Sequence, residues 1–132
     1  MDITDLMIGD WVQVPSLIDN VEHYDAWCKV KQLRDYDLDV VGFKGLKYDE
    51  IAPIPLTPEI LEKNFGEKRA KGGFFYHFMG KELRGCEYIL EYHKDNRFAF
   101  CREHGGLLCY ISSVHELQHA LKLCRIKKEI IL

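Results

Sequence analysis

The sequence predicts an α+β fold: a small SH3-like β-barrel at the N-terminus, a short central helix, an antiparallel β-meander and a C-terminal amphipathic helix. Four short strand patterns, separated by glycine or aspartate turns, fill about the first fifty residues. Prolines 53 and 55 then interrupt the pattern, because proline lacks the backbone donor of a central strand. We therefore divide the chain into a β-barrel-like part, residues 1–53, and an α/β part, residues 54–132, and expect one shared core.

The first part contains four segments with the composition of strands, at residues 11–14, 26–33, 39–43 and 46–51. Gly9 and Asp10 supply a turn before the first of these segments, and barrels of the SH3 type often open in this way. The second segment alternates between apolar and polar side chains, which is typical of a half-buried strand. Lys44 and Gly45 supply a turn between the last two segments.

A central helix is predicted to begin at Pro58, since proline is favoured at the first helical position. Thr57 offers an N-cap, and Glu59 places a negative charge in the first turn. The helix is expected to run to about Asn64 and to end at Gly66.

The β-meander is expected to contain four strands, at residues 74–79, 87–93, 97–102 and 107–111. Ser113 is a candidate N-cap for the last helix, which runs from Val114 to about Arg125. Residues 126–132 form a tail or an edge strand. The apolar stripe of the last helix predicts three core side chains: Leu117, Leu121 and Cys124.

This last helix carries His115, Glu116 and His119 in the spacing of the H-E-x-x-H signature of zinc peptidases. In that chemistry two histidines on one helix face bind zinc, and the glutamate acts as general base. A catalytic zinc also needs a third protein ligand. The residues after His119 offer only Cys124 and Glu129, so a ligand would have to come from upstream. The two histidines lie nearly opposite the apolar stripe, so we expect them to face solvent, a partner or a second layer.

Three motifs carry a family resemblance: Leu6–Val12, Pro53–Leu61 and Val114–Leu121. With them the chain resembles a group of small proteins encoded by phages and mobile elements of gut bacteria. In that group the position of Glu116 is often Gln and that of His119 is often Asn, which implies that the zinc-peptidase match is accidental. Residues 67–112 do not follow the group. The resemblance implies a phage or mobile-element origin and carries over no activity.

Charge is unevenly distributed along the chain. The 18 basic and 21 acidic side chains give a net charge of −3, which argues against a general nucleic-acid binder. Residues 1–66 carry 6 basic and 13 acidic side chains, whereas residues 67–132 carry 12 and 8. An anion would therefore bind to the second half. Alternatively, the two halves attract each other or a symmetry mate.

The N-terminus is acidic where a signal peptide is basic, and no window has the length of apolar sequence that a membrane helix needs. We therefore expect a protein of the host-cell cytoplasm that does not contact membranes. The odd number of cysteines fits reduced thiols rather than a disulfide framework: Cys28, Cys86, Cys101, Cys109 and Cys124. No cofactor motif is present.

The segment most suggestive of ligand binding is a basic, glycine-containing loop at residues 67–73, which leads into an aromatic strand. Lysine, arginine and backbone N–H groups bind phosphate, and aromatic rings stack on bases. The alternative is a strand buried on both faces that follows a solvated loop. The candidate ligand-binding residues are those of the loop and strand, with the two histidines of the last helix: Lys68, Arg69, Lys71, Tyr76, His115 and His119.

Three classes of function remain open. The first is a non-catalytic binding protein for a phosphorylated small molecule or nucleotide, acting as a possible homo-oligomer. Its most concrete version is a phage counter-defence protein that sequesters an anionic nucleotide immune signal. The second is a zinc metallopeptidase that uses His115, Glu116 and His119. The third is an adaptor for a protein or a nucleic acid, and the acidic first half disfavours nucleic acid.

Overall fold

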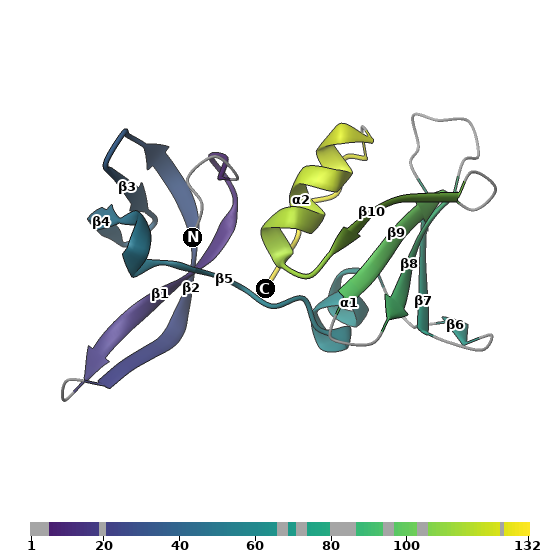
Figure 1. Ribbon diagram of the computed structural model, residues 1–132, viewed down its shortest axis with the longest axis horizontal. Coiled ribbons are helices and arrows are strands. Elements are labelled where there is room, and N and C mark those ends of the chain that lie inside the picture. Colours follow the sequence, from purple (N-terminus) through teal and green to yellow (C-terminus); the bar gives the residue numbers. More distant parts are fainter. Residues whose placement is uncertain are drawn as a thin grey trace. The chain divides into compact units, whose positions relative to one another are not determined.

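The computed structural model describes residues 6–18, 21–65, 69–70, 74–79, 87–93, 97–102, 106–124 and 126–132 (Figure 1). Side chains are described for the same residues apart from 15–18, 21–25, 69–70, 74–79, 87–89 and 92–93. The chain divides into two compact units, Met1–Ile54 and Pro55–Leu132. Each unit contains a five-stranded antiparallel sheet. The second unit adds two α-helices, so the predicted α+β class is confirmed.

The sheet of the first unit has the strand order β4-β3-β2-β1-β5. Its strands are β1 Trp11–Ile18, β2 Val21–Leu33, β3 Asp37–Val40, β4 Phe43–Lys47 and β5 Ala52–Pro53, with a 3-10 turn at Tyr48–Glu50. In the described residues β4 and β5 are the edges of an open sheet. Pro53 therefore stands in an edge strand, as its missing backbone donor requires.

Several boundaries in this unit differ from the sequence-based prediction. β2 begins at Val21 instead of residue 26, and β3 spans Asp37–Val40 instead of residues 39–43. The predicted strand 46–51 is replaced by the end of β4 at Lys47 and the 3-10 turn. β1 continues past Pro15 because its pairing with β2 shifts register between Val14 and Pro15, and a bulge tolerates proline. The turn between β3 and β4 lies at Val41 and Gly42, not at Lys44 and Gly45. Gly42 has φ 100°, a conformation that glycine adopts without steric cost.

The predicted turn at Gly9 and Asp10 is present and is fixed against β2. The amide of Gly9 donates to the carbonyl of Val30 at 2.8 Å, and the amide of Val30 donates to the carbonyl of Asp10 at 2.8 Å. The carboxylate of Asp10, fully buried, accepts from the amide of Met7 at 2.8 Å. The turn sits against the core of this unit: Leu6, Val12, Val14, Val30, Leu38, Val40 and Ile51.

An arginine fork holds the β2–β3–β4 region together. The guanidinium of Arg34 donates to both carboxylate oxygens of Asp39, at 3.1 and 2.6 Å, and also to Asp37. Asp39 accepts a further bond from the amide of Gly45 at 2.8 Å, and the hydroxyl of Tyr48 donates to the carbonyl of Arg34. These contacts lower the pKa of Asp39 to about 2, mainly through the bond from Arg34.

The sheet of the second unit has the order β10-β9-β8-β7-β6. Its strands are β6 Arg69–Ala70, β7 Phe74–Met79, β8 Glu87–His93, β9 Arg97–Arg102 and β10 Gly106–Ile111. Three of the four predicted strands have the predicted bounds, and the fourth begins one residue earlier. The prediction of a loop throughout residues 67–73 is wrong at Arg69 and Ala70, which pair with Phe75 and Phe74.

The first helix, α1, spans Pro58–Phe65, one residue longer than predicted. Thr57 caps it as expected, since its hydroxyl accepts from the amide of Ile60 at 3.3 Å. The C-terminal segment returns to this helix. Asn64 donates from its side-chain amide to the carbonyl of Ile131 at 2.9 Å and accepts from the amide of Ile131 at 2.7 Å.

The second helix, α2, spans Val114–Leu123 and ends two residues before the predicted Arg125. Ser113 caps it, as predicted. Leu117 and Leu121 are buried, which confirms their place in the core, whereas Cys124 is only half-buried. The largest fully buried side chains of this unit are Leu56, Leu61, Leu90, Phe98, Phe100, Leu117, Leu121 and Ile130.

Candidate functional site

The glutamate of the H-E-x-x-H pattern serves the helix cap. The carboxylate of Glu116 accepts from the hydroxyl of Ser113 at 2.7 Å and from the hydroxyl of Ser112 at 3.2 Å. The amide of Glu116 donates to the hydroxyl of Ser113 at 3.4 Å. Ser113 and Glu116 therefore form a variant of the S-x-x-E capping pattern. This pattern shares its glutamate with the zinc signature, and it accounts for Glu116 without any metal.

The two histidines of the pattern have different surroundings. His115 is only 6% exposed, and its Nδ1 lies 3.1 Å from the hydroxyl of Ser113. His119 is half-buried, and the two ring centroids are 5.6 Å apart in an edge-on arrangement. The solvent-facing option is therefore wrong for His115. Beside the start of α2, the chain before α1 pairs with the residue that caps the helix: Pro55 forms an antiparallel bridge with Ser113.

The histidines of α2 are not part of a ready metal site in the described residues. No group of three or more His, Cys, Asp or Glu side chains there is arranged to hold a metal ion. The third ligand that zinc catalysis requires is not found among them.

The basic segment is placed only in part. Lys68 and Lys71 lie outside the described residues, and the side chains of Arg69 and Tyr76 do as well. The backbone shows that Arg69 is in β6, opposite Phe75, and that Tyr76 is in β7, opposite Leu90. The structure does not bring these four positions together with His115 or His119 through any described contact.

The second sheet has two chemically different faces. Cys109 of β10 is opposite Phe100 and interacts electrostatically with Glu116 of α2, so this face belongs to the side of α2. Phe98 and Phe100 share it and are fully buried. The opposite face, which we call the Tyr110 face, carries five described side chains around the buried Ala99: Glu91, Arg97, Cys101, Leu107 and Tyr110.

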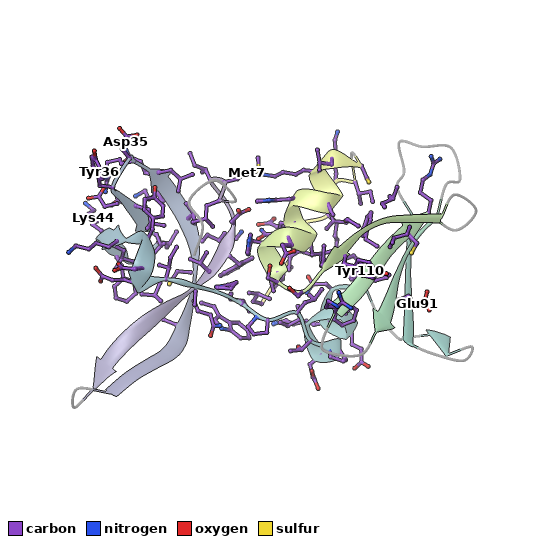
Figure 2. All side chains as sticks on the ribbon, viewed as in Figure 1. Met7, Asp35, Tyr36, Lys44, Glu91 and Tyr110 are labelled. Carbon is purple, nitrogen blue, oxygen red and sulfur yellow. The ribbon has the colours of Figure 1, made fainter. Side chains whose placement is uncertain are left out.

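The Tyr110 face displays an exposed aromatic ring beside an exposed cation. The guanidinium carbon of Arg97 lies 5.1 Å from the ring centroid of Tyr110, which is 46% exposed. This is the geometry of a cation–π contact. Figure 2 shows Tyr110 and Glu91 on this sheet. Sequence patterns did not single out either residue of the pair, because Arg97 and Tyr110 come from different strands.

One row of residues crosses the whole sheet through this face. Tyr110 is opposite Ala99, Ala99 is opposite Glu91, and Glu91 is opposite Phe75. Phe75 is in turn opposite Arg69. Four strand spacings of about 4.8 Å separate the two ends, or roughly 19 Å in total. The register thus connects the Arg97–Tyr110 pair to β6, which lies within the predicted basic segment.

Three of the described cysteines are not activated nucleophiles. Burial raises the pKa of Cys28, Cys101 and Cys109 above the ordinary thiol value. Neighbouring groups add to the effect, namely Glu91 at Cys101 and Cys124 with Glu116 at Cys109. These three thiols are therefore protonated at neutral pH, whereas a cysteine nucleophile needs a lowered pKa.

Comparison with protein families, with curated proteins and with solved structures finds no match for this chain. Among the described residues, neither helix has the length and apolar character needed to cross a membrane. Function is therefore argued from the geometry of the chain's own residues.

Proposed function

We propose that the chain is a non-catalytic binding protein whose second unit holds an anionic ligand with a planar ring, of the nucleotide class, on the Tyr110 face. The observation that carries this proposal is the exposed Arg97–Tyr110 pair. An exposed tyrosine ring offers a stacking surface for a base. The arginine beside it offers two parallel N–H donors to a phosphate.

The rest of the row supports the same ligand chemistry. Glu91 is half-buried two strands away from Tyr110. A carboxylate accepts several hydrogen bonds, including those from N–H or O–H donors of a base or sugar. Arg69, at the other end of the row, belongs to the basic segment that also contains Lys68 and Lys71. The span of roughly 19 Å suits a ligand with more than one phosphate or more than one nucleoside.

The resemblance to phage and mobile-element proteins makes the proposal more concrete. A binding protein from that setting, working in the host cytoplasm, would act by sequestering an anionic nucleotide immune signal. The first unit we propose to be a barrel of the SH3 type, because its five antiparallel strands, its size and its Gly-Asp opening fit that architecture.

The test is a calorimetric screen of the full chain against cyclic and ADP-ribose-type nucleotides, repeated with Arg97→Ala and Tyr110→Ala. We expect binding of at least one nucleotide. The arginine variant should weaken it about tenfold or more, since a hydrogen bond to a charged group contributes about 1.5–3 kcal/mol. Loss of the ring should cost about 1–3 kcal/mol of stacking.

Lys122→Ala is the matched control, because Lys122 is exposed on α2, away from the Tyr110 face, and its loss removes the same single charge. It should leave the affinity unchanged. A panel without any binding, or a bound nucleotide that is indifferent to both Arg97→Ala and Tyr110→Ala, contradicts the proposal.

A further inference from the structure

The outer edge of β10 is exposed over most of its length. β10 is the terminal strand in the order β10-β9-β8-β7-β6, so β9 pairs with only one of its sides. Leu107, Leu108 and Tyr110 are 51%, 47% and 46% exposed, and Cys109 between them is exposed as well. The outer edge of β10 therefore presents four consecutive exposed residues without a charge.

Edge strands of this kind are normally protected against pairing, by lysine, proline, a bulge or a short length. The other three edges of the described sheets follow this rule. β5 contains Pro53 and spans two residues, β6 spans two residues, and β4 carries Lys44 and Lys47. β10 has six residues without a charge or a proline, and the register shift between Leu107 and Cys109 is the one protective feature of this kind that it has.

The charges near the two ends of β10 have opposite sign. Arg102, exposed, is opposite Gly106 at one end and shares the face of Phe100. Glu116 lies at the other end, where Ser112, the residue after β10, donates to its carboxylate.

We propose that β10 pairs antiparallel with the β10 of a second copy of this chain, so that two five-stranded sheets continue into one across a two-fold axis. Such an axis is perpendicular to the sheet and keeps the two α2 faces on the same side. Antiparallel pairing about this axis places the Arg102 end of each copy beside the Glu116 end of the other, so that two such pairs of opposite charges form. The strand itself contributes no like charges that would face each other. This inference does not depend on the proposed nucleotide site.

The charges at the two ends of β10 favour antiparallel pairing with a second copy of this chain over other binding modes of this edge. A parallel pairing of two copies would place Arg102 beside Arg102 and Glu116 beside Glu116. An unrelated extended peptide would supply the backbone hydrogen bonds, but nothing would place opposite charges at both ends. Antiparallel self-pairing of β10 supplies the backbone hydrogen bonds and also brings opposite charges together at both ends.

The test is the molar mass of the full chain by light scattering and sedimentation across a concentration series, in reductant so that no disulfide contributes. We expect a reversible dimer. Leu108→Lys places two like charges within the paired edge and should raise the dissociation constant at least about tenfold. Leu123→Lys is the matched control, because Leu123 is 85% exposed on α2, and it should leave the dimer unchanged.

Two further variants test the charge pairing. Arg102→Glu reverses one end, and Glu116→Gln removes the charge at the other while keeping a hydrogen-bond acceptor for Ser113. Each should weaken the dimer in low salt, and the loss should shrink as salt screens the charges. A chain that stays monomeric throughout the series overturns the proposal. So does a dimer that Leu108→Lys leaves intact, with circular dichroism confirming that the variants are folded.

Discussion

The hydroxyl of Ser113 donates to the carboxylate of Glu116 at 2.7 Å, while the amide of Glu116 donates back to that hydroxyl at 3.4 Å. This reciprocal contact at the start of α2 is a stabilising device for the helix. The carboxylate of Glu116 therefore takes part in the hydrogen bonds of the helix N-cap. Helix capping therefore accounts for the glutamate of the pattern that resembles a zinc signature.

The first prediction concerns zinc. Protein purified without chelator should contain far less than one equivalent of zinc by elemental analysis, because the described residues offer no third ligand near His115 and His119. His115→Ala should leave the trace amount unchanged. One equivalent of zinc that disappears in this variant would instead support the metallopeptidase interpretation.

The second prediction concerns the cap itself. Ser113→Ala should lower the free energy of unfolding by about 0.5–2 kcal/mol, since the amide of Glu116 loses its capping acceptor. Urea denaturation measures the change. Ser112→Ala removes only the 3.2 Å bond to Glu116 and serves as the control, with a smaller expected effect. Equal losses in the two variants would contradict the assignment of Ser113 as the cap.

The third prediction concerns the packing of α2. Leu117 is fully buried, so Leu117→Ala should lower the free energy of unfolding by about 2–5 kcal/mol through lost burial and the cavity left behind. Leu123→Ala makes the same chemical change at a side chain that is 85% exposed and should cost almost nothing. Thermal and urea unfolding of the two variants side by side measure the contrast, and its absence would refute the helix orientation.

The fourth prediction concerns stability in acid. The pKa of Asp39 is lowered from 3.8 to about 2, mainly by the hydrogen bond from Arg34. The ionised carboxylate therefore favours the folded state. Its contribution is complete above pH 3.8 and is lost as the pH falls toward 2. Asp39→Asn should flatten the pH dependence of unfolding in this window and leave the dependence at neutral pH unchanged. An identical acid limb in the variant would contradict the role of the fork.

The fifth prediction concerns the basic segment. Replacing Lys68, Arg69 and Lys71 together by alanine should lower the affinity for any nucleotide that the chain binds, and salt should weaken the remaining binding. The free energy of unfolding should barely change, since exposed charges contribute little to stability. Calorimetry and urea denaturation measure the two effects. Unchanged affinity would confine the site to the Arg97–Tyr110 end of the row.

Sequence patterns by themselves determined the elements whose signals are local. Thr57 and Ser113 cap their helices as predicted, because a cap depends on the residues within one turn of it. The strands at 74–79, 87–93 and 97–102 have the predicted bounds. In each case a run of residues with high strand propensity is bounded by residues that favour turns. The burial of Leu117 and Leu121 follows from the helical period alone.

Only the tertiary structure decided features that depend on distant partners. Pro15 remains within β1 because β2 accommodates a register shift opposite it, which no local pattern reveals. His115 is buried although the helical wheel places it opposite the apolar stripe. A segment about sixty residues earlier in the chain also pairs with Ser113 at the start of α2, which the helical period does not reveal. The row from Tyr110 to Arg69 and the exposed edge of β10 likewise arise from strand order. Pairing between strands is set by contacts across the whole unit, and the chain written in one dimension does not contain them.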